Sequence, residues 1–358
     1  MAEKITVLFD DRKITILYTM FPFWISSFRK KFCFTTNLDW VLKKDKNKNL
    51  LLVGWFQKQD RDGRHKMLLV DLGKKYNKVF FVDDNDGSES HFLDLLPYLD
   101  KYYKKQVFRD RSIYSRELYG KRIFTHYYHT EFGVDEMPIP ESLPKLKNKG
   151  DLSKLEVSWN LAFGQYPVSK WKHHSAKLLF RLFGAHALKY LFSPLKLGQI
   201  PNPSIEKCQA RFGYKEYRPL IGYQRKRFLE ILQGSPDFLI GKIPIEAYNK
   251  EVRNVKAVLS PFGWGEVCFR DFEAILNGCV LVKPDMDHVE TWPEIFIKDT
   301  TYLRVNWDGS DIIENVQNLF KDDFNLEKIR TTAWNELKIA YSQLDDRILM
   351  IIGDFESD

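Results

Sequence analysis

Apolar and polar positions along the first half of the chain predict short buried strands. Apolar runs of four to eight residues that end in Asp or Gly are typical of parallel strands. Three such runs occur, at residues 4–11, 49–56 and 78–87. Residues 67–76 fit either a strand or part of a helix. Residues 91–103 have helical spacing that Pro97 interrupts, and residues 121–129 predict a further strand.

The second half alternates strands and helices regularly, which predicts βαβ units and a parallel sheet covered on both faces. The expected strands are residues 218–223, 237–242, 256–261, 279–284 and 300–305. The expected helices are residues 225–233, 245–255, 266–278, 311–322 and 326–352. At 1.5 Å per residue the last would be about 40 Å long. Such sheets bind ligands beyond the carboxyl ends of their strands, which directs attention to residues 222–227, 261–273 and 283–292.

Two polar, proline-containing breaks divide the chain of 358 residues, at 134–153 and 193–204. This length suits two domains. We therefore expect two Rossmann-like units, a connecting segment and a helix that returns to the first unit. Their expected limits are residues 1–165 for the N-terminal domain, 166–204 for the connection, 205–325 for the C-terminal domain and 326–358 for the returning helix.

Composition narrows the possible partners. The net charge of +7 suits a ligand that carries phosphates or an anionic membrane surface, and the scattered lysines argue against nucleic acid. Four irregularly spaced cysteines favour neither a disulfide framework nor a zinc site, and a reducing cytosol is the default. We find no signal region and no stretch of about 18 apolar residues, and we expect a cytoplasmic protein.

The most informative segment is SPFGWGEVCFRDFEAILNGCVLVKPD, residues 260–285. Its predicted strand leads into a loop that contains Gly263 and Gly265, and a helix follows. Glycines let the backbone approach a ligand closely, and the amino end of a helix offers free N–H groups to phosphate. This order of elements predicts a phosphate-binding loop.

Charged residues follow that loop at helical spacing. Glu266, Arg270 and Glu273 would share one helix face. A guanidinium group can bind a diphosphate through paired hydrogen bonds, and a carboxylate can accept both hydroxyls of a ribose. An ordinary amphipathic helix with a surface ladder of charges is the alternative.

The segment FRDFEAILNGCVLVKP resembles the donor-binding region of GT-B glycosyltransferases, especially the CgeB-like and exostosin-like groups. The matching residues are Arg270, Phe272, Glu273, Ala274 and Gly278. The resemblance implies an α/β, GT-B-like fold with two Rossmann-like domains facing across a cleft. It also implies that Glu273 holds the nucleotide ribose and Arg270 the diphosphate side. In the commonest GT-B form two glutamates bracket seven residues, whereas here Glu266 and Glu273 bracket six.

Two neighbouring segments add candidate donor contacts. Gly222 followed by cations, with Arg225 as the preferred contact, resembles the GT-B element that binds the diphosphate; a solvated basic face is the alternative. In the segment 283–296, Lys283, His288 and Trp292 are candidate donor contacts; His288 could hydrogen-bond a sugar, and Trp292 could pack against a nucleotide base or a sugar. The alternative for that segment is a helix cap with a buried tryptophan.

The first half offers catalytic candidates by residue type. Asp84 and Asp86 resemble the D-x-D of metal-dependent GT-A transferases, although such acidic strand ends are often turns. Candidates for a catalytic base on the acceptor side are Asp84, His126 and Glu131. We expect no cofactor beyond the donor; a divalent metal is possible but not expected.

These observations predict transfer of a sugar from a nucleoside-diphosphate sugar to a glycan or lipid-linked glycan. One alternative is a GT-A-like, metal-dependent transferase that uses Asp84 and Asp86. Another is a non-catalytic module that binds nucleotide or glycan. Residues 171–196 are basic and amphipathic, which predicts either peripheral membrane contact or a helix packed between domains.

Overall fold

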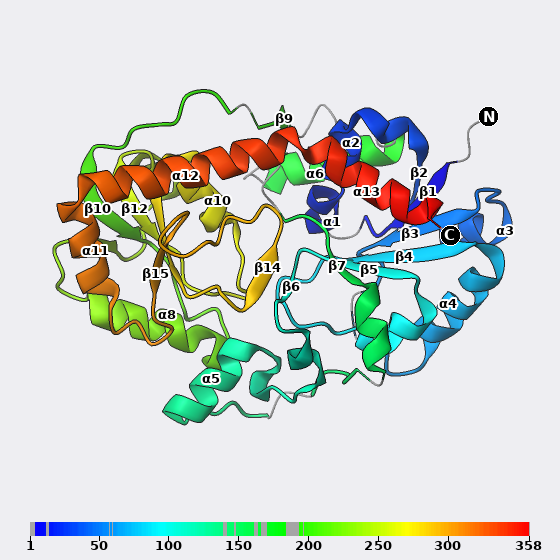
Figure 1. Ribbon diagram of the computed structural model, residues 1–358, viewed down its shortest axis with the longest axis horizontal. Coiled ribbons are helices and arrows are strands. Elements are labelled where there is room, and N and C mark those ends of the chain that lie inside the picture. Colours follow the sequence, from blue (N-terminus) through cyan, green and yellow to red (C-terminus); the bar gives the residue numbers. More distant parts are fainter. Residues whose placement is uncertain are drawn as a thin grey trace.

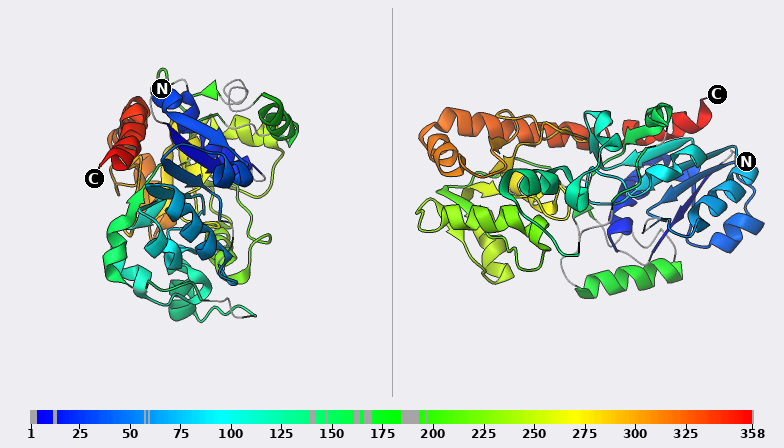
Figure 2. Two further views of the ribbon diagram at one scale, coloured as in Figure 1. Left: turned by 90° about the vertical axis from the view of Figure 1, so that its right-hand side faces the viewer. Right: turned by 90° about the horizontal axis from the view of Figure 1, so that it is seen from below.

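The protein is described by a computed structural model that covers residues 4–11, 14–56, 58, 60–138, 142–146, 148–160, 164–165, 170–183, 193–195 and 197–357. Two α/β units lie next to each other, and α12 (Asp323–Ser342) runs from the second unit towards the first (Figure 1). The two ends of the chain both lie at the N-terminal unit (Figures 1 and 2). The expected architecture of two Rossmann-like units is confirmed.

The N-terminal unit is built on a six-stranded sheet in the order β2-β1-β3-β4-β5-β7, and every neighbouring pair is parallel. Alternate residues bury opposite faces: Val7 and Val53 join one apolar cluster, and Leu8 and Leu52 join another. Its strands are β1 (Ile5–Phe9), β2 (Phe32–Thr35), β3 (Asn49–Val53), β4 (Lys78–Asp83), β5 (Lys101–Lys104) and β7 (Leu155–Val157). Its helices are α1 (Ile14–Thr19), α2 (Phe21–Ile25), α3 (Leu38–Lys43), α4 (Arg64–Lys75) and α6 (Lys170–Phe183).

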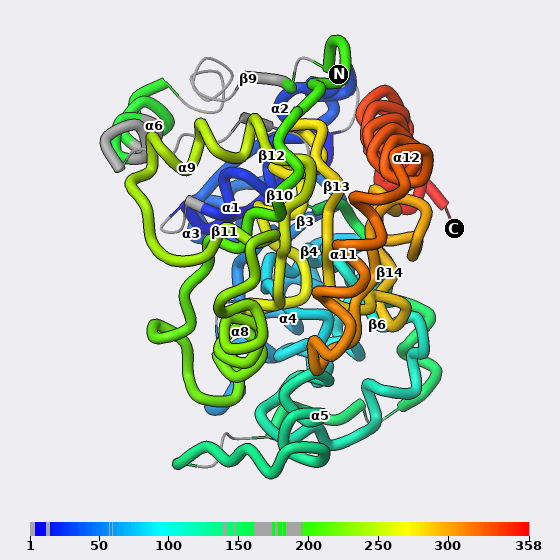
Figure 3. The backbone as a smooth tube through the Cα atoms, turned by 90° about the vertical axis from the view of Figure 1, so that its left-hand side faces the viewer, coloured from blue at the N-terminus to red at the C-terminus, as the bar shows by residue number. Residues whose placement is uncertain are grey.

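The C-terminal unit has a five-stranded sheet in the order β11-β10-β12-β13-β15, again parallel throughout (Figure 3). In both sheets the strand order reverses beside the first strand, between β1 and β3 and between β10 and β12. The strands are β10 (Ile205–Ala210), β11 (Phe238–Ile240), β12 (Val255–Leu259), β13 (Val280–Pro284) and β15 (Leu303–Val305). The helices are α8 (Pro219–Leu232), α9 (Ile245–Val252), α10 (Phe269–Leu276) and α11 (Ile312–Lys321).

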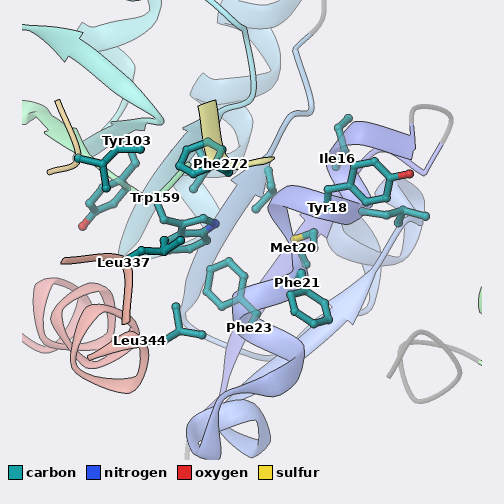
Figure 4. Close-up of a cluster of buried hydrophobic side chains, with 14 of the residues drawn as sticks. Ile16, Tyr18, Met20, Phe21, Phe23, Tyr103, Trp159, Phe272, Leu337 and Leu344 are labelled. Atoms are coloured by element: carbon teal, nitrogen blue, oxygen red, sulfur yellow. The ribbon is translucent and has the colours of Figure 1, made fainter. Parts of the chain in front are cut away.

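Several connections hold the units together. β6 (Gln106–Phe108) of the first half pairs antiparallel with β14 (Val289–Thr291) of the second. α5 (Ile123–Phe132) packs on α8, where the amide of Gln224 donates to the hydroxyl of Tyr128 over 2.6 Å. α13 (Leu344–Glu356) lies on the N-terminal sheet, and Phe355 stacks on Phe80. An apolar cluster continues across the junction and includes Phe23, Trp159, Phe272 and Leu337 (Figure 4).

Two strand predictions are wrong. Residues 121–129 belong to helix α5, because the buried Phe124, Thr125 and Tyr128 follow helical spacing and form the face that meets α8. Residues 218–223 form the start of helix α8, with Pro219 in its first turn, where the missing N–H costs nothing. The first strand of this sheet is β10 instead. Its exposed start, Ile205–Glu206, gives it too polar a pattern for recognition.

Other elements agree with the pattern to within a few residues. The strands expected at 49–56, 78–87, 256–261 and 279–284 are present. Residues 67–76, whose pattern fits either a strand or part of a helix, are helical. Residues 91–103 are not one helix, because a 3-10 helix at Leu93–Tyr98 precedes β5. The tail is two helices, which meet at Gln343. None of the helices in the described ranges is long and apolar enough to cross a membrane.

Candidate functional site

The candidate site lies where the strand order of the C-terminal sheet reverses. The carboxyl ends of β10 and β12 open there onto Arg211–Gly213 and residues 260–266. Doubly wound sheets bind ligands at this point because the loops after the two strands diverge. Residues from α8, α9 and α10 converge on it, as described below.

Two arginines, Arg225 of α8 and Arg270 of α10, come together at this place. Their guanidinium carbons lie 5.7 and 5.8 Å from the ring centre of Phe212. Arg225 is 5% exposed and donates to the carbonyls of Phe262 (2.6 Å) and Gly213 (3.1 Å). Burial holds the pKa of Arg225 below its usual value, and the charge of Arg270 acts in the same direction.

Neither guanidinium has a carboxylate within ion-pair distance among the residues that the structure describes. Arg270 donates through Nη2 to the carbonyl of Arg211 over 3.2 Å, and its buried Nε has no hydrogen-bond partner in the same part of the chain. Nearby Arg211 differs, because it pairs with Glu251 at 2.7 Å. Two guanidinium groups without a direct ion pair, next to a switch point, could together bind an anion with more than one charge.

Aromatic rings and glycines shape the surroundings of Arg225. The guanidinium lies 4.6 Å from the ring of Tyr217, which packs against the half-exposed Trp264 at 5.3 Å. Gly263 leaves room for Arg225, since a β-carbon there would come within 3.2 Å of Nη2. Gly222 lies inside α8, against the carbonyl of Tyr214. It is therefore a packing position for the loop that carries Tyr217, rather than the loop after a strand that its sequence context predicted.

Glu273 lies one turn after Arg270 on α10. Its Oε2 accepts a hydrogen bond of 3.0 Å from the hydroxyl of Tyr248 on α9. Burial raises the pKa of Tyr248 to about 12; the charge of Arg270 opposes that shift, and Glu273 adds to it. Tyr248 therefore stays protonated and keeps the carboxylate next to the arginine pair.

Lys283 stabilises the strands and the helix that surround the site. Its Nζ lies 3.0 Å from Oδ1 of Asp271, and both side chains are fully buried. Asp271 also accepts from the backbone of Cys268 at 2.9 Å and from the hydroxyl of Ser260 at 2.5 Å. This network ties the end of β12 to the start of α10 and to β13. Because Asp271 neutralises it, Lys283 is placed as a structural cation, and its predicted contact with the donor stays untested.

The loops after β12 and β4 meet face to face. At Gly265 a β-carbon would lie 1.7 Å from the carbonyl oxygen of Asp86, so only glycine permits this approach. Glu266 is fully buried, and its Oε2 accepts from the backbone N–H of Ser88 over 2.9 Å. The expectation that Glu266 shares a helix face with Arg270 is wrong, because α10 begins at Phe269. Nε2 of His288 lies 3.8 Å from Oε1 of Glu266.

The two aspartates of the D-x-D both lie within ion-pair distance of a lysine. Nζ of the buried Lys105 lies 3.4 Å from Asp84 and 3.5 Å from Asp86, and Thr19 donates to Asp84. The ammonium group of Lys105 thus offsets part of the negative charge of the two carboxylates. Within the described ranges, no group of three or more His, Cys, Asp or Glu side chains could hold a metal ion.

The remaining predicted residues lie away from the arginine pair. His126 Nδ1 accepts from the backbone of Tyr119 at 3.3 Å, and Glu131 is exposed near the end of α5. Trp292 packs under the guanidinium of Arg347 at 5.2 Å, at the edge of both apolar clusters. The catalytic roles of His126 and Glu131 and the base contact of Trp292 stay predictions.

The sequence reasoning missed a buried carboxylate in the loop after β4. Glu89 is 3% exposed, and its Oε1 lies 3.5 Å from Nη2 of Arg122. Arg122 in turn donates to the carbonyl of Trp264 over 2.6 Å. The only signal available was an acidic residue shortly after the Asp-rich end of a strand.

The sequence matches no protein-family model and no curated protein. Among solved structures, HepE of Anabaena in complex with UDP is 9% identical, with a TM-score of 0.47, over 98% of this chain and 99% of HepE. A glycosyltransferase from Rickettsia africae ESF-5 is 9% identical, with a TM-score of 0.46, over 98% of each chain. TarM of S. aureus is 11% identical, with a TM-score of 0.45, over 89% of this chain and only 57% of TarM. At these values the likenesses do not identify a substrate for this chain.

Proposed function

We propose that the protein is a glycosyltransferase that binds a nucleoside-diphosphate sugar at the C-terminal unit. The observation that carries the proposal is the pair of guanidinium groups of Arg225 and Arg270. Both lie close to the ring of Phe212, and neither has a carboxylate within ion-pair distance in the described residues. A diphosphate matches such a pair in charge and in hydrogen-bonding geometry. When the bond to the sugar breaks, the same two cations would stabilise the charge that develops on the leaving diphosphate.

The other parts of the site fit the rest of such a donor. Glu273, held by Tyr248, has carboxylate oxygens for the ribose hydroxyls. The half-exposed Trp264, packed against Tyr217, offers an aromatic surface next to the diphosphate position. The loop of Ser88 and Glu89 faces this site from the first half of the chain.

In this proposal residues 1–165 bring the acceptor, a glycan or a lipid-linked glycan, and residues 205–325 bind the donor. The segment 166–204 and the tail 326–358 connect the two parts. The contact between the loops after β4 and β12 would exclude water from the reacting sugar. A non-catalytic binding module would show the same ligand binding without turnover.

A thermal-shift screen of the full chain tests the proposal. UDP-, GDP-, ADP- and CMP-sugars are added, and the responding compound is incubated to detect release of its nucleotide. At a concentration of about 100 times the dissociation constant, a ligand that binds only the folded state adds about 2.7 kcal/mol to stability. We expect one class of nucleotide sugar to raise the melting temperature and to be turned over. A protein that responds to none of them would contradict the proposal.

Replacing Glu273 by alanine should weaken binding of the nucleoside diphosphate at least tenfold. Charge-assisted hydrogen bonds contribute about 1.5–3 kcal/mol each, and about 1.4 kcal/mol corresponds to a factor of ten. Calorimetry with the nucleoside diphosphate alone measures this change without the sugar. Glu230→Ala, which removes an exposed carboxylate of α8, is the matched control. Equal affinity in a well-folded Glu273→Ala protein would leave α10 as an ordinary charged helix.

Chelation of metal ions should leave nucleotide binding and most of the activity intact. Two arginines supply positive charge at the diphosphate, and Lys105 offsets part of the negative charge of Asp84 and Asp86. The measurement compares turnover with and without EDTA and includes Asp86→Asn, which should retain donor binding. Complete loss on chelation, restored by Mn²⁺, would favour the GT-A-like alternative.

The predicted membrane contact through residues 171–196 falls partly outside the described residues. Within α6, Phe180 is buried against Phe9, whereas Leu178, Leu182 and Phe183 are exposed. The helix lies at the edge of the molecule in the view from below (Figure 2). Exposed leucines on a helix whose sequence is rich in Lys and Arg suit an anionic membrane surface. Peripheral membrane contact through this helix is part of the proposal.

A further inference from the structure

Where the two halves meet, buried polar atoms gather that have no hydrogen-bond partner in the described part of the chain. They are Oγ of Ser88, Oε2 of Glu89, Oε1 of Glu266 and Nε2 of His288. The first two belong to the loop after β4, and the other two follow β12 and β13. Buried polar groups are almost always paired, so four such atoms at one junction retain the capacity to bind hydroxyl groups of a ligand.

Glu89 also borders a pocket on the N-terminal unit. Phe108, Tyr114, Leu118 and Lys121 line this pocket together with Glu89, and residues 142–145 close its outer side. Polar and aromatic side chains of this kind suit a sugar-like acceptor. Glu89 thus lies between a pocket of the acceptor half and the Glu266–His288 pair of the donor half.

The surroundings of Glu89 suit a group that gains and loses a proton near neutral pH. Burial raises its pKa to about 7; Arg122 opposes that shift, Glu266 reinforces it, and Lys104 opposes it as well. For Glu266 burial also raises the pKa, but the nearby His288, whose Nε2 lies 3.8 Å from Oε1, outweighs it and holds the pKa below the usual value. Of the two carboxylates, Glu89 is the one placed to accept a proton.

We propose that Glu89 is the catalytic base, which accepts the proton of an acceptor hydroxyl that arrives through this pocket. The inference rests on the proposed sugar transfer. The acceptor O–H bond breaks, and its proton passes to Oε2 of Glu89. The acceptor oxygen bonds to the anomeric carbon, and the bond from that carbon to the diphosphate breaks, with its electron pair leaving on the nucleoside diphosphate. Arg122 orients the carboxylate.

The test is Glu89→Gln in the full chain, with the nucleotide sugar found in the thermal-shift screen and water as the acceptor. Glutamine has the same shape but cannot take up the proton. We expect kcat for nucleotide release to fall about 10²–10⁴-fold, the usual contribution of a general base. The dissociation constant of the nucleotide sugar should change less than about twofold, because the donor contacts lie elsewhere. The matched control is Glu206→Gln, an exposed carboxylate at the start of β10, which should behave as the wild type.

The pH profile separates a base from a merely structural carboxylate. The base must be ionised, so the wild-type rate should be full above a pH of about 7 and fall about tenfold per unit below it. Glu89→Asp should keep part of kcat, and its rate should still fall at acidic pH. In Glu89→Gln this fall, the acidic limb of the pH profile, should be absent. Unchanged kcat in Glu89→Gln, or an acidic limb that persists in it, would overturn the role of Glu89. A wild-type protein that releases nucleotide from none of the sugars would instead overturn the proposed function.

Discussion

Replacing Arg225 and Arg270 together by methionine should weaken binding of the nucleoside diphosphate at least a hundredfold. Each guanidinium offers the diphosphate charge-assisted hydrogen bonds of about 1.5–3 kcal/mol, and about 1.4 kcal/mol is a factor of ten. The two groups lie 5.7 and 5.8 Å from the ring centre of Phe212 and would act on one ligand, so each single variant should lose at least tenfold. Calorimetric titration of the four proteins forms a double-mutant cycle.

The matched control for this cycle is Arg227→Met. Arg227 lies on the same helix but donates to the carbonyl of Asp308 at 2.7 Å and packs over Phe132, away from the pair. Its replacement should leave nucleotide affinity unchanged. If the double variant folds and binds the nucleotide as tightly as the wild type does, the anion site is not where the donor binds.

Replacing Lys283 by methionine should lower the free energy of unfolding by about 3–5 kcal/mol. The substitution leaves Asp271 as a charge without its cation in a fully buried place, which is the costly way to break an ion pair. Denaturant unfolding followed by fluorescence measures the loss. Methionine has an apolar side chain of similar length, so the loss of unfolding free energy comes from the missing positive charge and not from a cavity.

Lys298→Met is the comparison for that experiment. Lys298 pairs with Asp287 at 2.8 Å, but both side chains are about half exposed. Exposed pairs contribute about 0–1 kcal/mol, so this variant should unfold almost as the wild type does. If Lys283→Met were equally mild, Lys283 would not be a structural cation, and its predicted role as a donor contact would regain support.

The local pattern predicted the part of the site between β12 and β13 well. Its strands, VKAVL and VLVKP, are mostly apolar, and its helix is marked by a preceding glycine loop and by Gly278 after its end. Arg270 and Glu273 could therefore be placed on one helix from spacing alone. Local signals decide such elements because the strands are buried on both faces and allow few polar residues.

Arg225 lies on a helix as predicted, but the strand expected before it is wrong. The run at 218–223 has strand-like composition, but Pro219 and the burial of Leu220, Gln224 and Arg225 belong to a helix. Arg225 reaches the site because α8 lies beside the loop after β10, an arrangement that only the tertiary structure provides. The strand β10 was missed because it starts with a partly exposed segment that contains the charged Glu206 and Lys207.

Glu89 could not be recognised from the sequence, because nothing local distinguishes it from the other acidic residues of its loop. It is buried by contacts that come from far along the chain: Arg122 on one side and the loop of Glu266 on the other. Lys283 is a related case, because a lysine at a strand end resembles a ligand contact in the sequence, and its buried partner Asp271 is visible only in the structure. Burial of charge depends on the whole fold.

The most direct test of the account is a calorimetric titration of the wild-type protein with UDP, GDP and ADP and with the corresponding monophosphates. The arginine pair is arranged for a diphosphate, and loss of one phosphate group removes charge-assisted hydrogen bonds worth at least about 1.4 kcal/mol. We predict that one diphosphate binds in a ratio of one to one and that its monophosphate binds at least tenfold more weakly. If no diphosphate binds, or if the monophosphate binds equally well, the pair of Arg225 and Arg270 is not a nucleotide-diphosphate site.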